Sequence, residues 1–304
     1  MNDPHHIRYV RRLEIDTFKW DQCIDSSANG LIYAYSYYLD TMAIQWDALI
    51  LGDYEAVMPL TWKKKWGIRY LYQPPFTQQL GVFSAAPLPE KRINQFLEEI
   101  KKYFSFAEIY LNYGNYHPGL LVHANYILDM GEGYQMLSSK YHKHLKRDLK
   151  KVARYHYQYT DVFDLKKAIA LSQSLYGSRI PHVQQADYDR FENLCRLAEK
   201  NSWMVLRAVN GPDGNLLAVA LLLIGLRRMH LIMSITLPEG RNLEANHFLI
   251  DNLIKEFAGW DFILDFEGSD IAGIARFYKH FDSLDQPYYF HRHNNLPWPL
   301  KWLK

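Results

Sequence analysis

The sequence predicts an α/β chain, of the α+β kind, in which two domains follow one another in tandem. Each domain is expected to hold a mixed, mostly antiparallel, twisted sheet flanked by helices. Three observations lead to this prediction: the chain length, the alternation of helical and strand-like patterns, and the repetition of one element order. The 304 residues suffice for two domains of ordinary size, roughly 100–200 residues each. With 48% hydrophobic and 22% charged residues, the composition is typical of a globular protein.

The first half of the chain places two helical patterns before a block of strands. Helices are predicted near residues 17–26 and 35–43, and runs rich in β-branched and aromatic residues predict strands at 46–51, 55–62 and 68–72. Pro89 then opens an amphipathic helix with an apolar face of Ile93, Phe96, Leu97 and Ile100. A strand at 106–110 closes the series.

The second half repeats this order. Helices are predicted at 165–176 and 188–200, strands at 203–209, 216–226 and 229–236, a helix at 243–257 and a strand at 262–266. Because helix–helix–strand–strand–strand–helix–strand occurs twice, two related domains are favoured over one large sheet. We place the first domain at residues 1–135 and the second at 136–304, beginning with a basic helix at 140–154.

That basic segment reads KYHKHLKRDLKKVAR and has an apolar stripe at helical spacing. Its other faces carry many cations and one acid, Asp148. These cations form a solvated helix face in one interpretation. In the other they contact a polyanion such as tRNA or a CoA nucleotide, because clustered cations bind phosphates by charge and counterion release. The residues that would make this contact are Lys146, Arg147, Lys150 and Lys151.

Several functional classes are disfavoured by the composition. The formal charge of +2 gives no overall signal for nucleic acid, and Cys23 and Cys195 form neither a disulfide framework nor a CxxC metal motif. The N-terminus lacks the apolar core of a secretion signal, and the longest apolar run, 216–226, is too short to span a bilayer. His291 and His293 would share a strand face, but no third ligand is evident. We expect a cytoplasmic protein without a metal or a membrane span.

The stretch DFILDFEGSDIAGIARFYKHFDS, residues 261–283, carries the candidate chemistry. Asp265 and Glu267 are two residues apart on a predicted strand, so their side chains should point to one face. There they could hold an amine or remove its proton, or they could instead cap the helix that follows near Asp270. Tyr278 lies on that predicted helix, and an aromatic residue at helical spacing is more often part of a core.

The second half resembles the GNAT N-acyltransferase superfamily. The resemblance is carried by SWMVLRAVN, NLLAVALLLIGL, RMHLIMSIT, RNLEANHFLIDNLIKEF, DFILDF and IARFYKHF in that order. The doubling of this pattern, with a basic helix before the second copy, resembles the tandem-domain FemABX and FemAB-like type. Over residues 46–113 the resemblance depends on element order alone.

The resemblance implies transfer of an acyl group, with acetyl as the first expectation, from an acyl-CoA co-substrate to a small-molecule or peptidyl amine. It implies donor binding by Ile235 and Thr236 on the fourth strand and by Arg241 and Asn242 in the loop PEGRNLEAN. It also implies Glu267 or Asp265 as the group that binds or deprotonates the amine, and Tyr278 as the acid. The loop departs from the family's Gln/Arg-x-x-Gly-x-Gly/Ala pattern at Glu244, where a glycine is expected. A carboxylate there repels phosphate.

Two alternatives therefore stay open. FemABX-type proteins use aminoacyl-tRNA as donor, so the chain could be a FemX-like peptidyltransferase of cell-wall peptide synthesis that contacts tRNA through the basic helix. Alternatively it could be a binding protein that kept the fold and lost catalysis, which Glu244 and Asp282 favour. The family pattern ends in Phe-Gly, whereas this chain has Phe281-Asp282.

Overall fold

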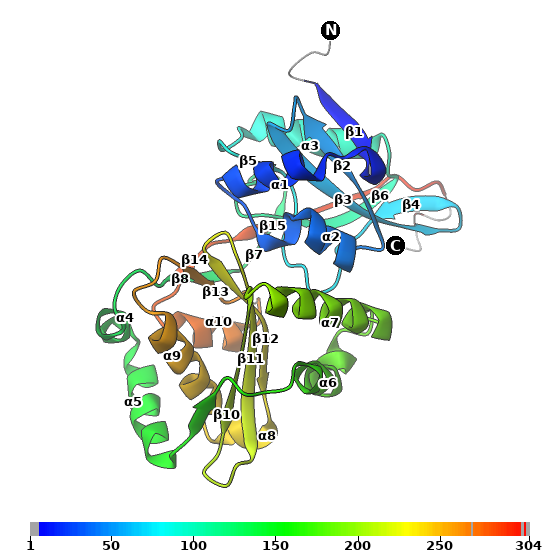
Figure 1. The fold of residues 1–304 in the computed structure, drawn as a ribbon. Coiled ribbons are helices and arrows are strands. Elements are labelled where there is room, and N and C mark those ends of the chain that lie inside the picture. Colours follow the sequence, from blue (N-terminus) through cyan, green and yellow to red (C-terminus); the bar gives the residue numbers. More distant parts are fainter. Residues whose placement is uncertain (1–5, 269, 299–300, 302–304) are drawn as a thin grey trace. The chain divides into compact units, whose positions relative to one another are not determined.

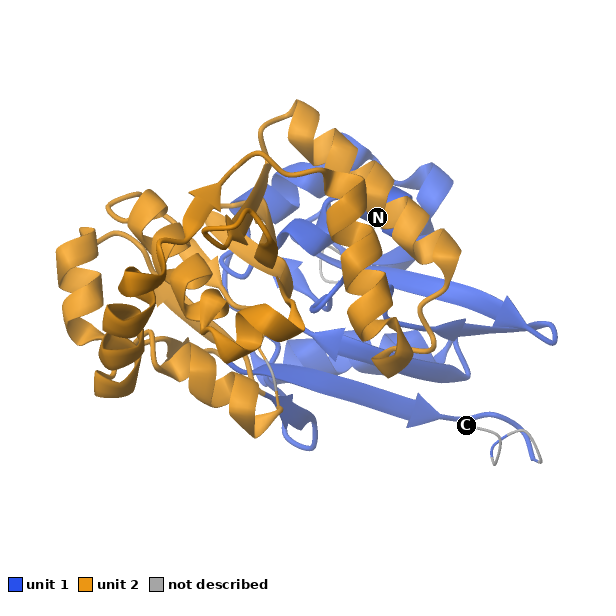
Figure 2. Cartoon of the chain, turned by 90° about the horizontal axis from the view of Figure 1, so that it is seen from below, with its two compact units in different colours: residues 1–123, 287–304 blue, residues 124–286 orange. Residues whose placement is uncertain are grey.

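The chain is described by a computed structural model that covers residues 6–268, 270–298 and 301. It divides into two compact units (Figure 2). Unit 1 comprises Met1–His123 with Pro287–Lys304, and unit 2 comprises Ala124–Gln286. Within the described ranges, none of the helices has the length and apolarity needed to cross a membrane.

In its described residues, unit 1 contains a sheet of eight strands with three α-helices (Figure 1). Its elements are β1 (Ile7–Arg11), α1 (Thr17–Ser26), α2 (Ser36–Met42), β2 (Gln45–Leu51), β3 (Ala56–Lys65), β4 (Ile68–Leu71), β5 (Phe83–Ser84), α3 (Glu90–Lys101), β6 (Phe106–Leu111), β7 (Leu121–His123) and β15 (Tyr288–Asn294). The face of α3 predicted to be apolar, Ile93, Phe96, Leu97 and Ile100, is buried in the core of this unit.

Unit 2 contains a sheet of seven strands. Its elements are β8 (Tyr126–Asp129), α4 (Tyr134–Lys140), α5 (Lys143–Val152), β9 (Gln158–Thr160), α6 (Leu165–Tyr176), α7 (Gln185–Lys200), β10 (Met204–Asn210), β11 (Leu216–Gly225), β12 (Arg228–Thr236), α8 (Pro238–Asn242), α9 (Ala245–Phe257), β13 (Ile263–Asp265), α10 (Ala272–Lys279) and β14 (Leu284–Asp285). In Figure 1, α6 and α7 lie on one side of the long strands β10–β12, and α9 with α4 and α5 lies on the other.

The two sheets have corresponding strand orders. Unit 1 runs β1-β2-β3-β4-β6-β15-β7, and unit 2, from its opposite edge, runs β9-β10-β11-β12-β13-β8-β14. In each unit one neighbouring pair is parallel, β4 with β6 and β12 with β13, and the other pairs along these orders are antiparallel. The predicted fold class, two mixed and mostly antiparallel sheets flanked by helices, is confirmed.

The ends of the two units differ from the expected domain boundaries of 1–135 and 136–304. The last strand, β15, pairs with β6 and β7 of unit 1, and β8, at the start of unit 2, pairs with β13 and β14. Each of these strands therefore occupies the same position in its sheet, beside the second strand of the parallel pair. Such long-range pairings leave no local pattern in the sequence.

His291 and His293 of β15 share a face, as predicted, and are largely buried, with Nε2 of His291 3.2 Å from Nδ1 of His293. His293 Nε2 lies 2.9 Å from the carbonyl oxygen of Phe104. Burial lowers the pKa of His291 to about 4, and the neighbouring His293 contributes to the same shift. The contacts are those of a neutral pair within the unit 1 core.

Because of this histidine pair, we expect the free energy of unfolding to fall at acidic pH. Because the folded chain holds the pKa of His291 below its usual 6.5, the unfolded chain binds more protons between pH 6.5 and 4, and stability falls as the pH falls through that window. The full effect of such a shift is on the order of 3 kcal/mol, reached only below pH 4. Urea unfolding at pH 7 and pH 5 should show the loss in the wild-type chain. A His291→Phe variant should lose less between the two pH values, and an equal loss would contradict the assignment.

Candidate active site

The parallel strands β12 and β13 separate after a short stretch of pairing. Their register joins Arg228 to Ile263, Met229 to Leu264 and His230 to Asp265. β13 ends at Asp265, whereas β12 continues through residues 231–236. The edge of β12 that faces away from β11 is therefore not covered by β13 along this stretch.

A β-bulge lies where the strands separate. Leu221 of β11 is opposite Met233 and Leu223 is opposite His230, so β12 has one extra residue between these pairs. Such an insertion reverses the faces to which the following side chains point. Ser234 therefore reaches the helix on the α9 side, where its hydroxyl lies 3.2 Å from Oδ1 of Asn246.

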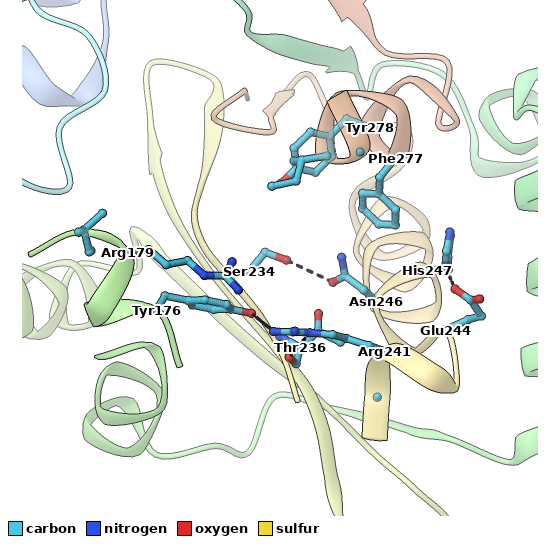
Figure 3. Close-up of a pocket in the computed structure, with 14 residues that line it drawn as sticks. Tyr176, Arg179, Ser234, Thr236, Arg241, Glu244, Asn246, His247, Phe277 and Tyr278 are labelled. Atoms are coloured by element: carbon cyan, nitrogen blue, oxygen red, sulfur yellow. Dashed lines mark hydrogen bonds and ion pairs between the residues drawn. The ribbon is translucent and has the colours of Figure 1, made fainter. Parts of the chain in front are cut away.

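A pocket of about 590 Å³ borders this open stretch of β12, and all of its lining residues belong to unit 2 (Figure 3). The strand contributes Ser234 and Thr236. The remaining lining comes from the end of α6 and the turn after it, from α8 and α9 with the junction between them, and from α10: Tyr176, Arg179, Ile180, Gly240, Arg241, Glu244, Asn246, His247, Gly273, Ile274, Phe277 and Tyr278.

Of the four residues predicted to bind a donor, two line this pocket. The backbone N–H of Thr236 lies 3.3 Å from the Tyr176 hydroxyl, and the Thr236 carbonyl oxygen accepts a hydrogen bond from Arg241 Nε at 3.2 Å. Arg241 thus folds back over the end of β12 (Figure 3). Ile235 and Asn242 are not among the lining residues: the Ile235 side chain is buried in the sheet, and Asn242 is exposed at the end of α8.

In the segment between β12 and α9, Gly240 lies so close to β11 that there is no room for a side chain. A Cβ on Gly240 would lie 2.3 Å from the carbonyl oxygen of Leu217, so a larger residue would displace this loop from β11. Glu244 precedes α9 in the left-handed conformation, and its carboxylate lies 2.9 Å from Nδ1 of His247. Burial lowers the pKa of His247 despite the opposing effect of Glu244. A neutral His247 leaves the negative charge of Glu244 at the head of α9.

Tyr278 lies on α10 at the side of the pocket, as Figure 3 shows. Its ring stacks on Phe266, with centroids 4.6 Å apart, and its side chain is largely buried. Burial raises the pKa of the Tyr278 hydroxyl well above its ordinary value, and the charges of Glu267 and Asp265 raise it further. Tyr278 therefore keeps its proton at neutral pH, as a general acid must. It belongs to the core and to the pocket wall at once.

Asp265 and Glu267 both approach His230. They do not do so as neighbours on one face of a strand, which was the arrangement predicted from the sequence. β13 ends at Asp265, and Glu267 has a positive φ of 60°, so the two residues are not on one regular strand. Neither of them caps α10: the helix begins after Ile271, and no side chain caps it. Instead, Oε1 of Glu267 lies 2.8 Å from Nδ1 of His230, and Oδ2 of Asp265 lies 3.9 Å from the same atom.

Asp265 is held inside unit 2 by further donors. Its side chain is fully buried, and Arg228 NH1 lies 2.7 Å from Oδ2. Oδ1 accepts hydrogen bonds from Asn125 Nδ2 and from the backbone N–H of Glu267, each at 3.0 Å. These contacts make Asp265 a structural partner of Arg228. Glu267, whose side chain is 15% exposed, is the more accessible of the two acids, and neither acid is among the lining residues of the pocket.

His230, Asp265 and Glu267 have ligand atoms within 4.8 Å of one another, an arrangement that could hold a metal ion. The guanidinium of Arg228 already lies on Oδ2 of Asp265 and supplies positive charge at that position. A divalent cation bound there would be repelled by this guanidinium. The cluster therefore fits an ion-paired network better than a metal centre.

The predicted basic helix forms as α5, after a break at Tyr141 and His142 that separates it from α4. Leu145 and Val152 are the buried residues of its apolar side, and Leu145 and Leu149 pack into the core of unit 2. The four cations predicted to contact a polyanion are all exposed: Lys146, Arg147, Lys150 and Lys151.

Sequence reasoning missed several residues in the pocket or beside Glu267, among them Arg179, Asn246 and His230. Arg179 is in a turn after α6, and its guanidinium lies over the ring of Tyr176, 5.3 Å from the centroid. His230 lies within an apolar strand, and Asn246 within an apolar helix. A polar residue inside a buried strand is a recognisable signal, because such residues require a partner.

Comparison with known proteins gives one family match. The acetyltransferase (GNAT) domain family matches residues 139–279. No curated protein matches the sequence.

Several solved structures resemble the chain over nearly its whole length. FemX has a TM-score of 0.66 at 14% identity, covering 97% of this chain and 99% of FemX. A tandem GNAT protein from the clavulanic acid biosynthesis pathway has a TM-score of 0.53 at 10% identity, covering 96% and 99%. The C-terminal domain of a putative lysylphosphatidylglycerol synthetase from Agrobacterium fabrum has a TM-score of 0.53 at 10% identity, covering 95% and 94%. At such identities the similarity concerns the fold.

Proposed function

We propose a function from the premise that the chain belongs to the GNAT superfamily of acyltransferases, in its tandem-domain, FemABX-like type. Unit 2 transfers an acyl group, acetyl in the first instance, from acyl-CoA to an amine. The observation that carries this proposal is the separation of β12 from β13 beside a pocket that contains Tyr278. An acyl donor in extended conformation can pair with the open backbone edge of β12, as an added strand does.

The charges around the pocket support binding of the donor's phosphates by Arg179 and Arg241. Both arginines lie beside Tyr176, with Arg241 NH2 3.4 Å from its hydroxyl. Guanidinium groups bind phosphate through paired, charge-assisted hydrogen bonds. The head of α9 is less suitable, because Glu244 places negative charge where the phosphates would approach.

The transfer needs a base and an acid. Glu267 accepts a proton from the ammonium form of the acceptor, and the freed nitrogen lone pair attacks the thioester carbonyl carbon. The carbon–sulfur bond then breaks, the Tyr278 hydroxyl protonates the leaving thiolate, and Tyr278 recovers a proton from the new amide nitrogen. The raised pKa of Tyr278 keeps its hydroxyl protonated until the thiolate forms, but it also makes that proton harder to give up, so the step depends on the coupled return of a proton from the amide nitrogen.

Replacing both arginines should weaken donor binding. In an Arg179→Gln, Arg241→Gln variant the Kd for acetyl-CoA should rise by about 10²–10⁴, since two charged hydrogen bonds are lost and each contributes on the order of 1.5–3 kcal/mol. Calorimetry measures the affinity, and thiol release with a panel of amines measures the transfer. Arg196→Gln, an exposed arginine of α7 that pairs with Glu192, is the matched control.

A truncated donor makes this test specific. The acetyl thioester of N-acetylcysteamine has no phosphates, so its turnover should be the same in the double variant as in the wild-type chain. Unchanged affinity for acetyl-CoA would contradict the phosphate site. Absence of both binding and thiol release with every amine would refute acyl-CoA as the donor.

The exposed cations of α5 favour a second candidate function, a FemX-like peptidyltransferase that uses aminoacyl-tRNA. Lys146, Arg147, Lys150 and Lys151 stand on the solvent side of the helix, with a single acid, Asp148, among them. Such a row of cations matches the phosphate backbone of RNA and needs no base contact.

Replacing these four cations by glutamine should remove most salt-dependent tRNA binding. If each of them contacts a phosphate, the slope of log affinity against log salt should fall by about 3. Fluorescence anisotropy with labelled tRNA measures this slope. A variant with the same loss of charge on α3, at Lys91, Arg92, Lys101 and Lys102, is the control. An equal effect in both variants would mean that net charge alone governs the binding.

A further inference from the structure

His230 is the residue of the site to which neither the sequence nor the comparisons assign a role. It is the last residue of β12 that pairs with β13, so it stands where the two strands separate. Its imidazole is fully buried, and Nδ1 lies 2.8 Å from Oε1 of Glu267. An imidazole placed inside a strand of apolar neighbours loses hydration, which its polar contacts must replace.

The contact with Glu267 determines which nitrogen of His230 carries a proton. An ionised carboxylate only accepts hydrogen bonds, so Nδ1 must be the donor to Oε1. Asp265, the other acid near Nδ1, is 3.9 Å away and has its own donors in Arg228 and Asn125. The short contact of His230 is therefore with Glu267, the acid that is partly exposed.

We propose that His230 is a positioning residue for acyl transfer, whose Nδ1–H fixes the carboxylate of Glu267 so that Oε2 faces the acceptor amine. The inference rests on the proposed function and adds to it the group that orients the base. His230 gives up no proton in the reaction: the proton of the ammonium goes to Glu267, and the bond between Nδ1 and Oε1 persists throughout.

The surroundings explain why this support is needed. Glu267 follows the end of β13 and has a left-handed backbone, so regular strand pairing does not fix its direction. Gly268 next to it packs so closely on Asn125 that a Cβ would lie 2.6 Å from the Asn125 Cα, which anchors the backbone but not the Glu267 side chain. The hydrogen bond from His230 restrains the carboxylate itself.

The proposal predicts a pH effect with a definite sign. Asp265 and Glu267, at and just after the end of β13, contact His230, and Arg228 on its own strand pairs with Asp265. Tyr278 on α10 is close enough to both acids for their charges to raise its pKa. Since Nδ1–H stabilises the ionised carboxylate, its removal should move the acidic limb of the kcat/KM profile to higher pH.

Two substitutions separate positioning from packing. His230→Leu removes the donor and keeps most of the volume, whereas His230→Asn keeps an N–H near the position of Nδ1. We expect His230→Leu to lower kcat by about tenfold to a hundredfold, with the donor KM unchanged and the acidic limb displaced upward. His230→Asn should recover most of kcat and the wild-type limb. If both variants lose the same activity and keep the wild-type pH profile, the role is structural and the proposal fails.

A measurement without substrate separates this proposal from the proposed function. Nitrogen NMR of the imidazole-labelled full chain at neutral pH should show His230 protonated at Nδ1, with a shift that changes in Glu267→Gln. An unprotonated Nδ1 would overturn the positioning role even in an active transferase. If Nδ1 is protonated but the wild-type chain transfers no acyl group from any donor, the role of His230 in transfer is also overturned. In that case the proposed function is wrong, and not the contact between His230 and Glu267.

Discussion

Glu267→Gln is expected to lower kcat by about 10²–10⁴, the range that a general base supplies. The substitution keeps the shape of the side chain, and the amide oxygen can still accept the hydrogen bond from His230 Nδ1. Only the capacity to take a proton is lost, so the temperature of unfolding should stay near that of the wild-type chain. Steady-state thiol release with acetyl-CoA and an accepted amine measures kcat.

Exposed acids provide the control for this prediction. Glu199→Gln removes a carboxylate from the solvent side of α7 and should leave kcat unchanged. Below the pKa of the amine, where the acceptor is an ammonium ion that the wild-type enzyme needs Glu267 to deprotonate, the Glu267→Gln variant should stay impaired. Rescue at a pH above that pKa, where the free amine is abundant, is the expected signature of a missing base. Full activity at neutral pH would show that another group, or water, removes the proton.

Many strands and helices of both units were predictable because they depend on local patterns. The apolar face of α3 and the long runs of β11 and β12 show the period of a buried helix and of buried strands. Tyr278 and Glu267 could be found as candidates because a resemblance aligned them with a known order of elements. The order of elements did not predict that Tyr278 is buried in the core or that Glu267 has a left-handed backbone.

What could not be predicted depends on contacts between distant residues. The placement of β15 in unit 1 joins residue 290 to residue 110, and that of β8 in unit 2 joins residue 128 to residue 264. The bulge in β12 is one extra residue in a run of apolar side chains and leaves no mark in the sequence. For the same reason the ion pair of Asp265 with Arg228, 37 positions before it, could not be predicted from the sequence.

Arg228→Met is expected to destabilise the protein by about 3–5 kcal/mol, because it leaves the fully buried carboxylate of Asp265 without its guanidinium. The remaining donors, Asn125 and the backbone N–H of Glu267, are neutral and cannot replace a positive charge. Asp265→Leu should cost a similar amount, since it leaves the guanidinium without its carboxylate. Urea unfolding at neutral pH measures both changes.

The double variant Arg228→Met, Asp265→Leu tests whether these losses come from losing the ion pair or from leaving one buried charge without its partner. Removing both charges leaves no uncompensated ion, so we expect the double variant to be more stable than either single one and the two effects to be strongly non-additive. The pair of Arg196 with Glu192 on α7 is the exposed comparison, and there each substitution should cost no more than about 1 kcal/mol. Additive losses at Arg228 and Asp265 would mean that the two side chains act independently. The Arg228–Asp265 pair would then not anchor the end of β13 as a coupled unit, and it would contribute less to the position of Glu267.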